Sequence, residues 1–199
     1  SGDQRRRDEP APDQQNPAYG SFELEDQLMD DFDATWPIIA TPDVQGGLER
    51  LRADSTLNHF TASCGQAIFQ GDHLPEDIRG DLFICEPVGR LIRRAKVINR
   101  DGQIFLKSAY YQKEFLASTD MNFRPVNMAT GPDGCLYIVD MYRGIIQESN
   151  WTREGSFLRP VIKREKLDKN FGRGRIYRLV YEDDKPGPRP QMLQESSEE

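Results

Sequence analysis

The stretches Gly80-Asp-Leu-Phe-Ile-Cys-Glu86 and Gly134-Cys-Leu-Tyr-Ile-Val-Asp140 decide the fold class of this chain. Each begins with glycine, crosses a short apolar run and ends in a carboxylate. A second pair, Gly89-Arg-Leu-Ile-Arg-Arg94 and Gly174-Arg-Ile-Tyr-Arg-Leu179, repeats in the same way. Short apolar runs bounded by glycine, proline and aspartate are typical of β-strands. Because a strand–turn–strand unit of this size recurs, we predict an all-β fold made of β-propeller blades, with a β-sandwich of similar hairpins as the alternative.

Working outward from these runs, the alternation of apolar segments and turn residues predicts antiparallel strands along most of the chain. A further connecting strand is expected at 67–70, and the turn Gly131-Pro-Asp-Gly134 separates two of the runs. The charged stretch 153–169, with its spaced apolar residues, is interpreted as a short helix or an irregular insertion. The five main strands are expected near 81–86, 90–97, 126–130, 135–140 and 174–181.

The two ends of the chain differ from its middle in composition. Residues 1–33 are polar and charged, with an acidic run at 23–33, and are predicted to be a largely disordered lead-in. Residues 184–199 are rich in proline and glutamate and are predicted to be a disordered linker. The globular part is therefore expected at 34–183. The start at Ser1, without methionine, is interpreted as that of a processed or excised piece.

Composition excludes several classes of function. The formal net charge of −7 argues against nucleic acid as the main partner, because phosphate binding requires a basic face. No apolar run is long enough for a membrane span, and no signal segment is present. The three cysteines form no CxxC or CxxCH motif, so neither a covalent haem nor a zinc site is expected, with two histidines in the whole chain.

Three segments resemble a known protein family. They are Trp36-Pro-Ile-Ile-Ala-Thr-Pro-Asp-Val-Gln-Gly-Gly47, then Phe69-Gln-Gly-Asp-His-Leu-Pro75 with Gly80-Asp-Leu-Phe-Ile-Cys-Glu-Pro87, and the long stretch that begins Phe123-Arg-Pro-Val-Asn-Met-Ala-Thr130 and continues to Gln147. Together they resemble the membrane-bound dehydrogenases of planctomycete-type bacteria, which are related to quinoprotein glucose/sorbosone dehydrogenases. The resemblance covers about residues 34–183.

This resemblance implies a six-bladed propeller of which the chain holds the last two blades. It implies a periplasmic or extracellular parent that oxidises a sugar or alcohol and passes electrons to a cytochrome. The expected partners are the remaining blades of the parent, a cytochrome c domain and a small sugar or alcohol, with no nucleic acid. The family's catalytic histidine belongs to earlier blades, so no catalytic residue is assigned here. The alternative is a non-catalytic propeller that binds carbohydrate or other proteins.

The cofactor implied for the parent is pyrroloquinoline quinone, with calcium. The carboxylates of the quinone require cations, and the resemblance aligns Arg124 with one cofactor arginine. At two other positions where the family pattern has a basic residue, this chain has Asn122 and Val88, so it departs from the pattern there. The full set of candidate cofactor-binding residues is Arg124, Asp140, Tyr142, Arg143 and Glu86.

Each of these candidates also has a structural interpretation. Arg124 can pair with Asp120 or Asp140 instead of a ligand, and the residues at the strand ends can pair within the protein. His59 and His73 are expected to be hydrogen-bonding residues of loops rather than bases. Asp133 is expected to cap the turn at 131–134.

The extracytoplasmic parent that the resemblance implies makes a disulfide between Cys64 and Cys85 the expected state. Turn residues in the loop 71–80 can bring the two cysteine-bearing strands alongside each other. The alternative is two buried free thiols that act as small apolar side chains. Cys135 is expected to remain unpaired.

Overall fold

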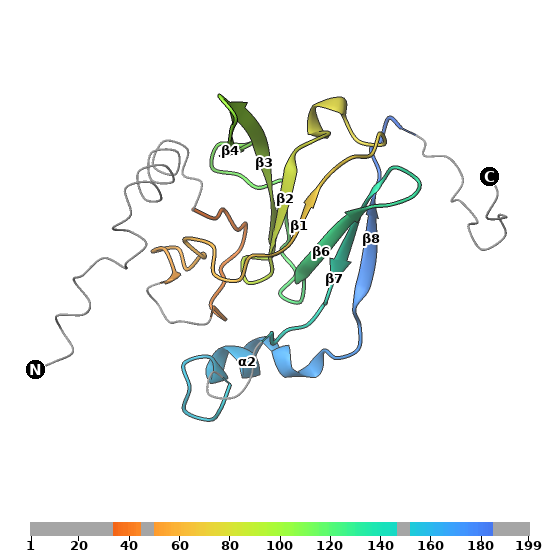
Figure 1. Cartoon of the computed structure of the whole chain (residues 1–199). Coiled ribbons are helices and arrows are strands. Elements are labelled where there is room, and N and C mark those ends of the chain that lie inside the picture. Colours follow the sequence, from red (N-terminus) through yellow and green to blue (C-terminus); the bar gives the residue numbers. More distant parts are fainter. Residues whose placement is uncertain (1–33, 45–49, 147–151, 185–199) are drawn as a thin grey trace, which may run out of the picture.

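The computed structural model describes residues 34–44, 50–146 and 152–184. The predicted lead-in at 1–33 and nearly all of the predicted linker at 184–199 lie outside the described residues. The described part is an antiparallel all-β structure of two sheets with few helical residues, which confirms the prediction of an all-β fold. Figure 1 shows the two sheets side by side and helix α2 at one end of the molecule. No helix within these described ranges is long and apolar enough to cross a membrane.

The first sheet is a meander in which each strand pairs with the next one along the chain. Its order is β1-β2-β3-β4, and the short β5 pairs with one end of β3. A 3-10 turn, η2 (Glu76–Ile78), lies between β1 and β2. The strands are β1 (Cys64–Ile68), β2 (Leu82–Glu86), β3 (Leu91–Arg100), β4 (Gln103–Ser108) and β5 (Leu116–Ala117).

The second sheet is a shorter meander of the same kind, with the order β6-β7-β8. Between β7 and β8 the chain forms helix α2 (Arg159–Glu165) and the 3-10 turn η4 (Leu167–Lys169), so the predicted helix within 153–169 is confirmed. Proline at the start of α2 and Lys166 in the left-handed conformation at its end limit the helix to two turns. The strands are β6 (Pro125–Thr130), β7 (Leu136–Asp140) and β8 (Arg175–Leu179).

The predicted strands are all present, but the sequence patterns placed some boundaries incorrectly. The first strand lies at 64–68 rather than 67–70, and β3 extends to Arg100. Strand β4 was not predicted, although Asp101-Gly102 forms the two-residue turn that joins it to β3. Both turn residues have positive φ, which is the geometry that favours Asp-Gly in a tight hairpin.

The sequence repeat corresponds to equivalent positions in the two sheets. Strands β2 and β7, which carry the two glycine-to-carboxylate runs, are each the second strand of their meander. The third-strand repeat is shifted by one residue, because Glu86 pairs with Leu91 whereas Asp140 pairs with Arg175. Arg90 therefore lies just outside β3, in a tight turn, and is not the structural counterpart of Arg175.

The two sheets pack against each other through their first strands. The contacts between the sheets are concentrated on β1 with β6 and on β2 with β6. Gly65 makes this approach possible, because a Cβ atom at that position would overlap the backbone carbonyl of Val126. The inner apolar core between the sheets consists of Phe83, Cys85 and Ile92 from the first sheet and Met128, Leu136 and Ile138 from the second.

Candidate functional site

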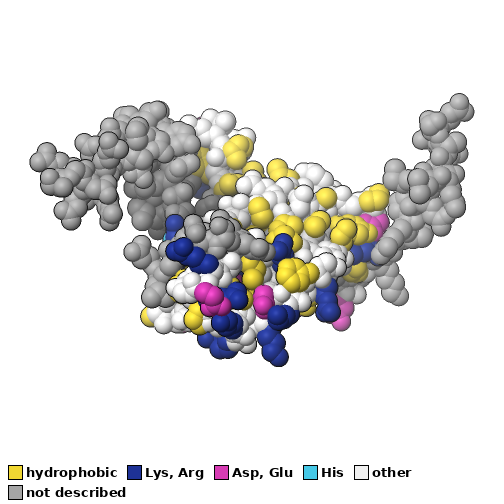
Figure 2. Space-filling view, turned by 90° about the horizontal axis from the view of Figure 1, so that it is seen from below, with side chains coloured by type: hydrophobic (Ala, Val, Ile, Leu, Met, Phe, Trp, Pro, Cys, Tyr) yellow, Lys and Arg dark blue, Asp and Glu magenta, His cyan; other side chains and the backbone are white. Residues whose placement is uncertain are grey.

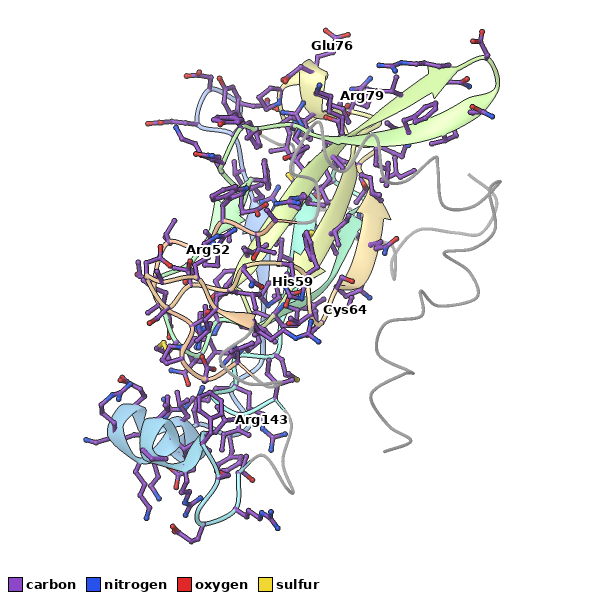
Figure 3. All side chains as sticks on the ribbon, turned by 90° about the vertical axis from the view of Figure 1, so that its left-hand side faces the viewer. Arg52, His59, Cys64, Glu76, Arg79 and Arg143 are labelled. Atoms are coloured by element: carbon purple, nitrogen blue, oxygen red, sulfur yellow. The ribbon has the colours of Figure 1, made fainter. Side chains whose placement is uncertain are left out.

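The structure brings the predicted cofactor-binding residues together at the α2 end of the two sheets. Glu86 ends β2 and Asp140 ends β7, while Arg124 immediately precedes β6. Tyr142 and Arg143 follow β7, and Figure 3 shows Arg143 next to α2, at the opposite end of the molecule from Glu76 and Arg79. All five residues therefore lie at the same end of the two sheets, where β2 and β7 end and β6 begins.

The centre of this region is a buried network of one acid and two arginines. Both carboxylate oxygens of Asp43 accept a hydrogen bond from Arg90 Nη2 at 2.8 Å, and Arg124 Nη2 donates to Asp43 Oδ2 at 2.5 Å. The side chains of Arg90, Arg124 and Asp43 are 0%, 1% and 7% exposed. Burial alone would raise the pKa of Asp43, but Arg124 and Arg90 outweigh burial and hold it below its ordinary value.

Arg124 is a structural connector. Its Nε donates to the carbonyl of Arg143 at 3.0 Å, its Nη1 to that of Pro87 at 2.9 Å, and its Nη2 also to that of Gly144 at 2.8 Å. Every guanidinium nitrogen therefore bonds to a protein oxygen. Its side chain pairs with Asp43, whereas the predicted partner Asp140 is bonded through the Arg124 backbone N–H, at 2.7 Å. Burial lowers the pKa of Arg124 to about 10, which leaves the guanidinium charged at neutral pH.

Arg90 makes equivalent connections in the turn between β2 and β3. Its Nη1 donates to the carbonyl of Val88 at 3.1 Å, and its Nε donates to that of Met121 at 3.2 Å. Together the two arginines join the loops around Asp43, Val88, Met121 and Gly144 into one unit. Buried charges are stable in a protein only when they are paired and hydrogen-bonded in this way.

Glu86 and Asp140 have equivalent roles in the two sheets. Glu86 accepts hydrogen bonds from the backbone N–H groups of Thr61, Ala62 and Val88 at 3.0, 2.9 and 3.1 Å. Asp140 Oδ1 accepts them from Arg124 and Tyr142 at 2.7 and 2.8 Å. Each acid thus ties the segment before the first strand to the turn after the second strand.

Burial of the Glu86 carboxylate disfavours its charged form. Glu86 is fully buried, and burial raises its pKa above the ordinary value despite the backbone hydrogen bonds that lower it. Asp140 is also buried, and its second oxygen, Oδ2, has no hydrogen-bond partner. Both carboxylates face backbone donors within the protein, and neither faces solvent.

Tyr142 belongs to a second, more exposed cluster. Its φ of 44° is in the left-handed region, which is rare for a bulky residue and is held here by surrounding bonds. Its hydroxyl donates to Asp120 Oδ2 at 2.8 Å, and this hydrogen bond raises the pKa of Tyr142. The guanidinium of Arg175 lies 3.4 Å from the centre of the Tyr142 ring, and the side chain of Asn170 donates to the Tyr142 carbonyl at 2.7 Å.

Arg143, the last of the predicted residues, lies over the ring of Phe171, with its guanidinium 5.5 Å from the ring centre. A small cavity of about 80 Å³ lies between the buried arginine network and α2. Asp43 and Arg124 line it on one side, and the apolar residues Leu158, Ile162 and Leu167 line it on the other. Its size is suited to a few water molecules rather than to a multi-ring cofactor.

These residues do not fit a quinone that carries several carboxylates. Arg124 is committed to protein oxygens, and the neighbouring Glu86 and Asp140 are acids that would repel the quinone. Asn122 bonds to Asp120 through its backbone N–H and its side-chain amide, and Val88 is buried and apolar. In the part of the chain that the structure describes, no three acid, histidine or cysteine side chains gather as a calcium or transition-metal site would require.

Sequence reasoning missed Asp43, Arg90 and Arg175, which hold this region together, and it considered Asp120 as a partner of Arg124 rather than of Tyr142. Asp43 and Arg90 lie within or next to the quoted motifs, but their pairing crosses 47 positions of the sequence. Arg175 was visible in the glycine-arginine repeat, which gave no sign that it would stack on Tyr142. The feature that marks this region is its set of buried arginines. The sequence alone does not reveal it, because it does not show which arginines are buried.

The residues that were expected to be structural behave as predicted. His59 Nε2 lies 2.5 Å from Arg50 Nη1, and His73 Nδ1 lies 2.6 Å from Asp184 Oδ2. Asp133 Oδ1 accepts the backbone N–H of Cys135 at 3.2 Å, so it caps the turn at 131–134. Both histidines therefore form side-chain hydrogen bonds, as expected, and the predicted cap at Asp133 is confirmed.

The three cysteines are free thiols in the structure, which differs from the predicted disulfide. Cys64 and Cys85 are cross-strand partners in the β1–β2 register, as the prediction required. The register of β1 shifts between Cys64 and Gln66, and the Cys64 sulfur lies 3.9 Å from the carbonyl oxygen of Pro125. Cys135 is buried and unpaired, as expected.

Comparison with known proteins yields one match. A family model described as a domain of unknown function, DUF7133, matches residues 7–183. No curated protein matches the chain. No solved structure matches it either.

Proposed function

This chain belongs to the DUF7133 family, a domain family of unknown function, and we propose that it is a pair of β-propeller blades that serves as a protein-interaction platform. Two antiparallel meanders that meet at their first strands support the propeller arrangement, since blades of a propeller approach one another most closely near the central axis. The bonding of Arg124 to protein oxygens favours this role over cofactor binding.

The observation that carries the proposal is that both sheets expose apolar side chains on their outer faces. On the first sheet, register pairs place Ile68 and Leu82 on one face, with Val97 and Leu106. A groove of about 450 Å³ lies on this face and is lined by Leu82, Ile84 and Leu106 together with His59, Phe60, Ser63 and Gln66. On the second sheet, Val139 and Ile176 are register partners and are 37% and 66% exposed.

The chain itself demonstrates how such faces are covered. The inner faces of the two sheets bury Phe83, Ile92 and Ile138 against each other. An outer face that exposes several apolar side chains is therefore suited to a further sheet of the same type. The expected occupants are the neighbouring blades of the parent protein. In the isolated chain, the outer face of one copy can meet the opposite outer face of another.

Such a contact is head-to-tail, because it joins two different surfaces, and this gives a specific test. Sedimentation velocity of the full chain at rising concentration should show self-association. Lysine at an exposed position of either outer face, Ile104→Lys or Ile176→Lys, should weaken it by about tenfold. Ile38→Lys is the matched control, because Ile38 is 59% exposed but lies outside the sheets, and it should have no effect.

Mixing the two face variants sharpens the experiment. Each variant keeps one intact outer face, so an equal mixture should form 1:1 dimers although each variant alone is monomeric. A wild-type chain that stays monomeric at all concentrations contradicts the proposal. Equal weakening by Ile38→Lys would show that the association is nonspecific and would contradict it as well.

A further inference from the structure

The segment around α2 and η4 has a charge opposite to that of the chain as a whole. Residues 153–175 contain eight basic and three acidic residues, in a chain whose net charge is −7. Figure 2 shows lysine and arginine side chains gathered on the face of the molecule that is seen from below in the view of Figure 1. Apart from Arg175, which stacks on Tyr142, the basic residues of this segment form the basic face: Arg153, Arg159, Lys163, Arg164, Lys166, Lys169 and Arg173.

The basic side chains on this face are largely exposed. Lys163, Arg164 and Lys169 are 61%, 60% and 74% exposed, and Arg159 is 30% exposed. Three carboxylates lie among them, of which Glu154 contacts both Arg159 and Lys163, at 3.1 and 3.0 Å. Ion pairs as exposed as these contribute little to stability, so the excess of cations has no evident role in holding the fold.

Exposed aromatic side chains accompany the cations. Phe157, just before α2, is 42% exposed, and Phe171, just after η4, is 61% exposed. The fold buries the other side of this segment, where Leu158, Val161, Ile162 and Leu167 form their own core. The two phenylalanines are therefore not needed for that core, and their exposure leaves apolar area available next to the cations.

We propose that this basic face binds an acidic polypeptide segment that carries apolar side chains. Protein interfaces are enriched in arginine and in aromatic residues, and this face has both. Glu154, Glu165 and Asp168 lie among the cations. A peptide can offer these carboxylates backbone N–H donors, whereas a polyphosphate or polysulfate has none to offer. The inference rests on the proposed role of the chain as an interaction platform and names the partner of one face.

The test is fluorescence anisotropy with the full chain and a labelled 12-residue peptide of glutamates with three spaced phenylalanines. A matched peptide with glutamine in place of glutamate is the ligand control. Binding of the acidic peptide should weaken with added salt. The face variant Lys163→Glu with Lys169→Glu should lose about tenfold in affinity. The control variant Lys107→Glu with Lys113→Glu has the same change in net charge at exposed lysines elsewhere, and its loss should be below about twofold.

Aromatic contacts provide a second readout. Phe171→Ser should weaken binding of the acidic peptide several-fold, although it changes no charge. Equal losses in the two lysine variants would overturn the proposal, since the effect would then be one of net charge. Heparin or anionic phosphatidylserine vesicles that bind through the same lysines more tightly than the peptide, and without any effect of Phe171→Ser, would overturn it too. The sheet-face variants Ile104→Lys and Ile176→Lys should leave peptide binding intact, so the two proposals fail separately.

Discussion

Arg124 Nη2 lies 2.5 Å from Asp43 Oδ2, although the two residues are 81 positions apart in the sequence. This contact joins the segment before the first sheet to the start of the second sheet. Because Asp43 also binds Arg90, a single carboxylate neutralises part of the charge of two buried guanidinium groups. The first expectation is therefore that the stability of the fold depends on Asp43.

Replacing Asp43 with alanine should destabilise the chain by about 3–5 kcal/mol, because two buried cations lose their partner. The free energy of unfolding is measured by urea denaturation at neutral pH. Asp101→Asn is the control, since Asp101 is exposed and asparagine tolerates its positive φ. A loss below about 1 kcal/mol in the Asp43 variant would mean that water or other residues satisfy the arginines.

The same residue predicts a dependence of stability on pH. The pKa of Asp43 is lower in the folded chain than its ordinary value of 3.8, so the folded state favours the charged form. Its contribution is fully present above the unfolded pKa and is lost as the pH falls below 3.8 through the folded pKa. Asp43→Asn should flatten the stability curve below that pH. Parallel curves for the two proteins would show that other carboxylates cause the acid unfolding.

The close approach of the two sheets at Gly65 can be tested with a pair of glycine variants. Gly65 and Gly102 both have positive φ, but a Cβ atom at Gly102 would meet nothing within 4 Å. Gly102→Ala should therefore cost about 1 kcal/mol for the backbone conformation alone. Gly65→Ala should cost about 2 kcal/mol more, because β1 must move away from β6. If both variants lose the same free energy of unfolding in thermal or urea denaturation, β1 and β6 do not make a tight contact at Gly65.

The cysteines predict an order of chemical reactivity. Burial raises the pKa of the Cys85 thiol to about 12 and raises that of Cys64 by a smaller amount. In the native protein at pH 8, Cys64 should react with a thiol reagent well before Cys85, since the thiolate is the reactive form. After denaturation without reductant, titration should give three thiols. A single thiol under these conditions would show that a disulfide forms after all.

The sequence patterns predicted the strands well because each strand satisfies a local rule. Each glycine-bounded apolar run, such as 80–86, forms one strand that is bounded by turns. Strand β4 escaped prediction because its apolar run, Ile104 to Leu106, is only three residues long, and only Asp101-Gly102 indicated the hairpin. The third-strand repeat was aligned one residue out of register, because glycine-arginine occurs in both copies by composition and not by structural equivalence.

The sequence indicated residues that lie together in the fold, but it did not indicate the contacts that these residues make. Arg124, Glu86 and Asp140 lie together, as strand ends in a repeated unit must. Their partners are backbone groups and Asp43, and long-range pairing of this kind leaves no local pattern in the sequence. A resemblance to a family shows which positions correspond to its binding residues. Whether a side chain at such a position is available to a ligand depends on its burial and its hydrogen bonds, which are known only from the folded structure.

The most direct test of the account is equilibrium titration of the full chain with pyrroloquinoline quinone in the presence of calcium, followed by quinone absorbance. Because the donors of Arg124 are bonded to protein oxygens, we expect no saturable binding, and we expect Arg124→Lys to change the stability of the fold but not the absorbance. Saturable binding that Arg124→Lys abolishes, in a variant that remains folded by circular dichroism, would contradict the interaction-platform account and would favour a quinoprotein dehydrogenase.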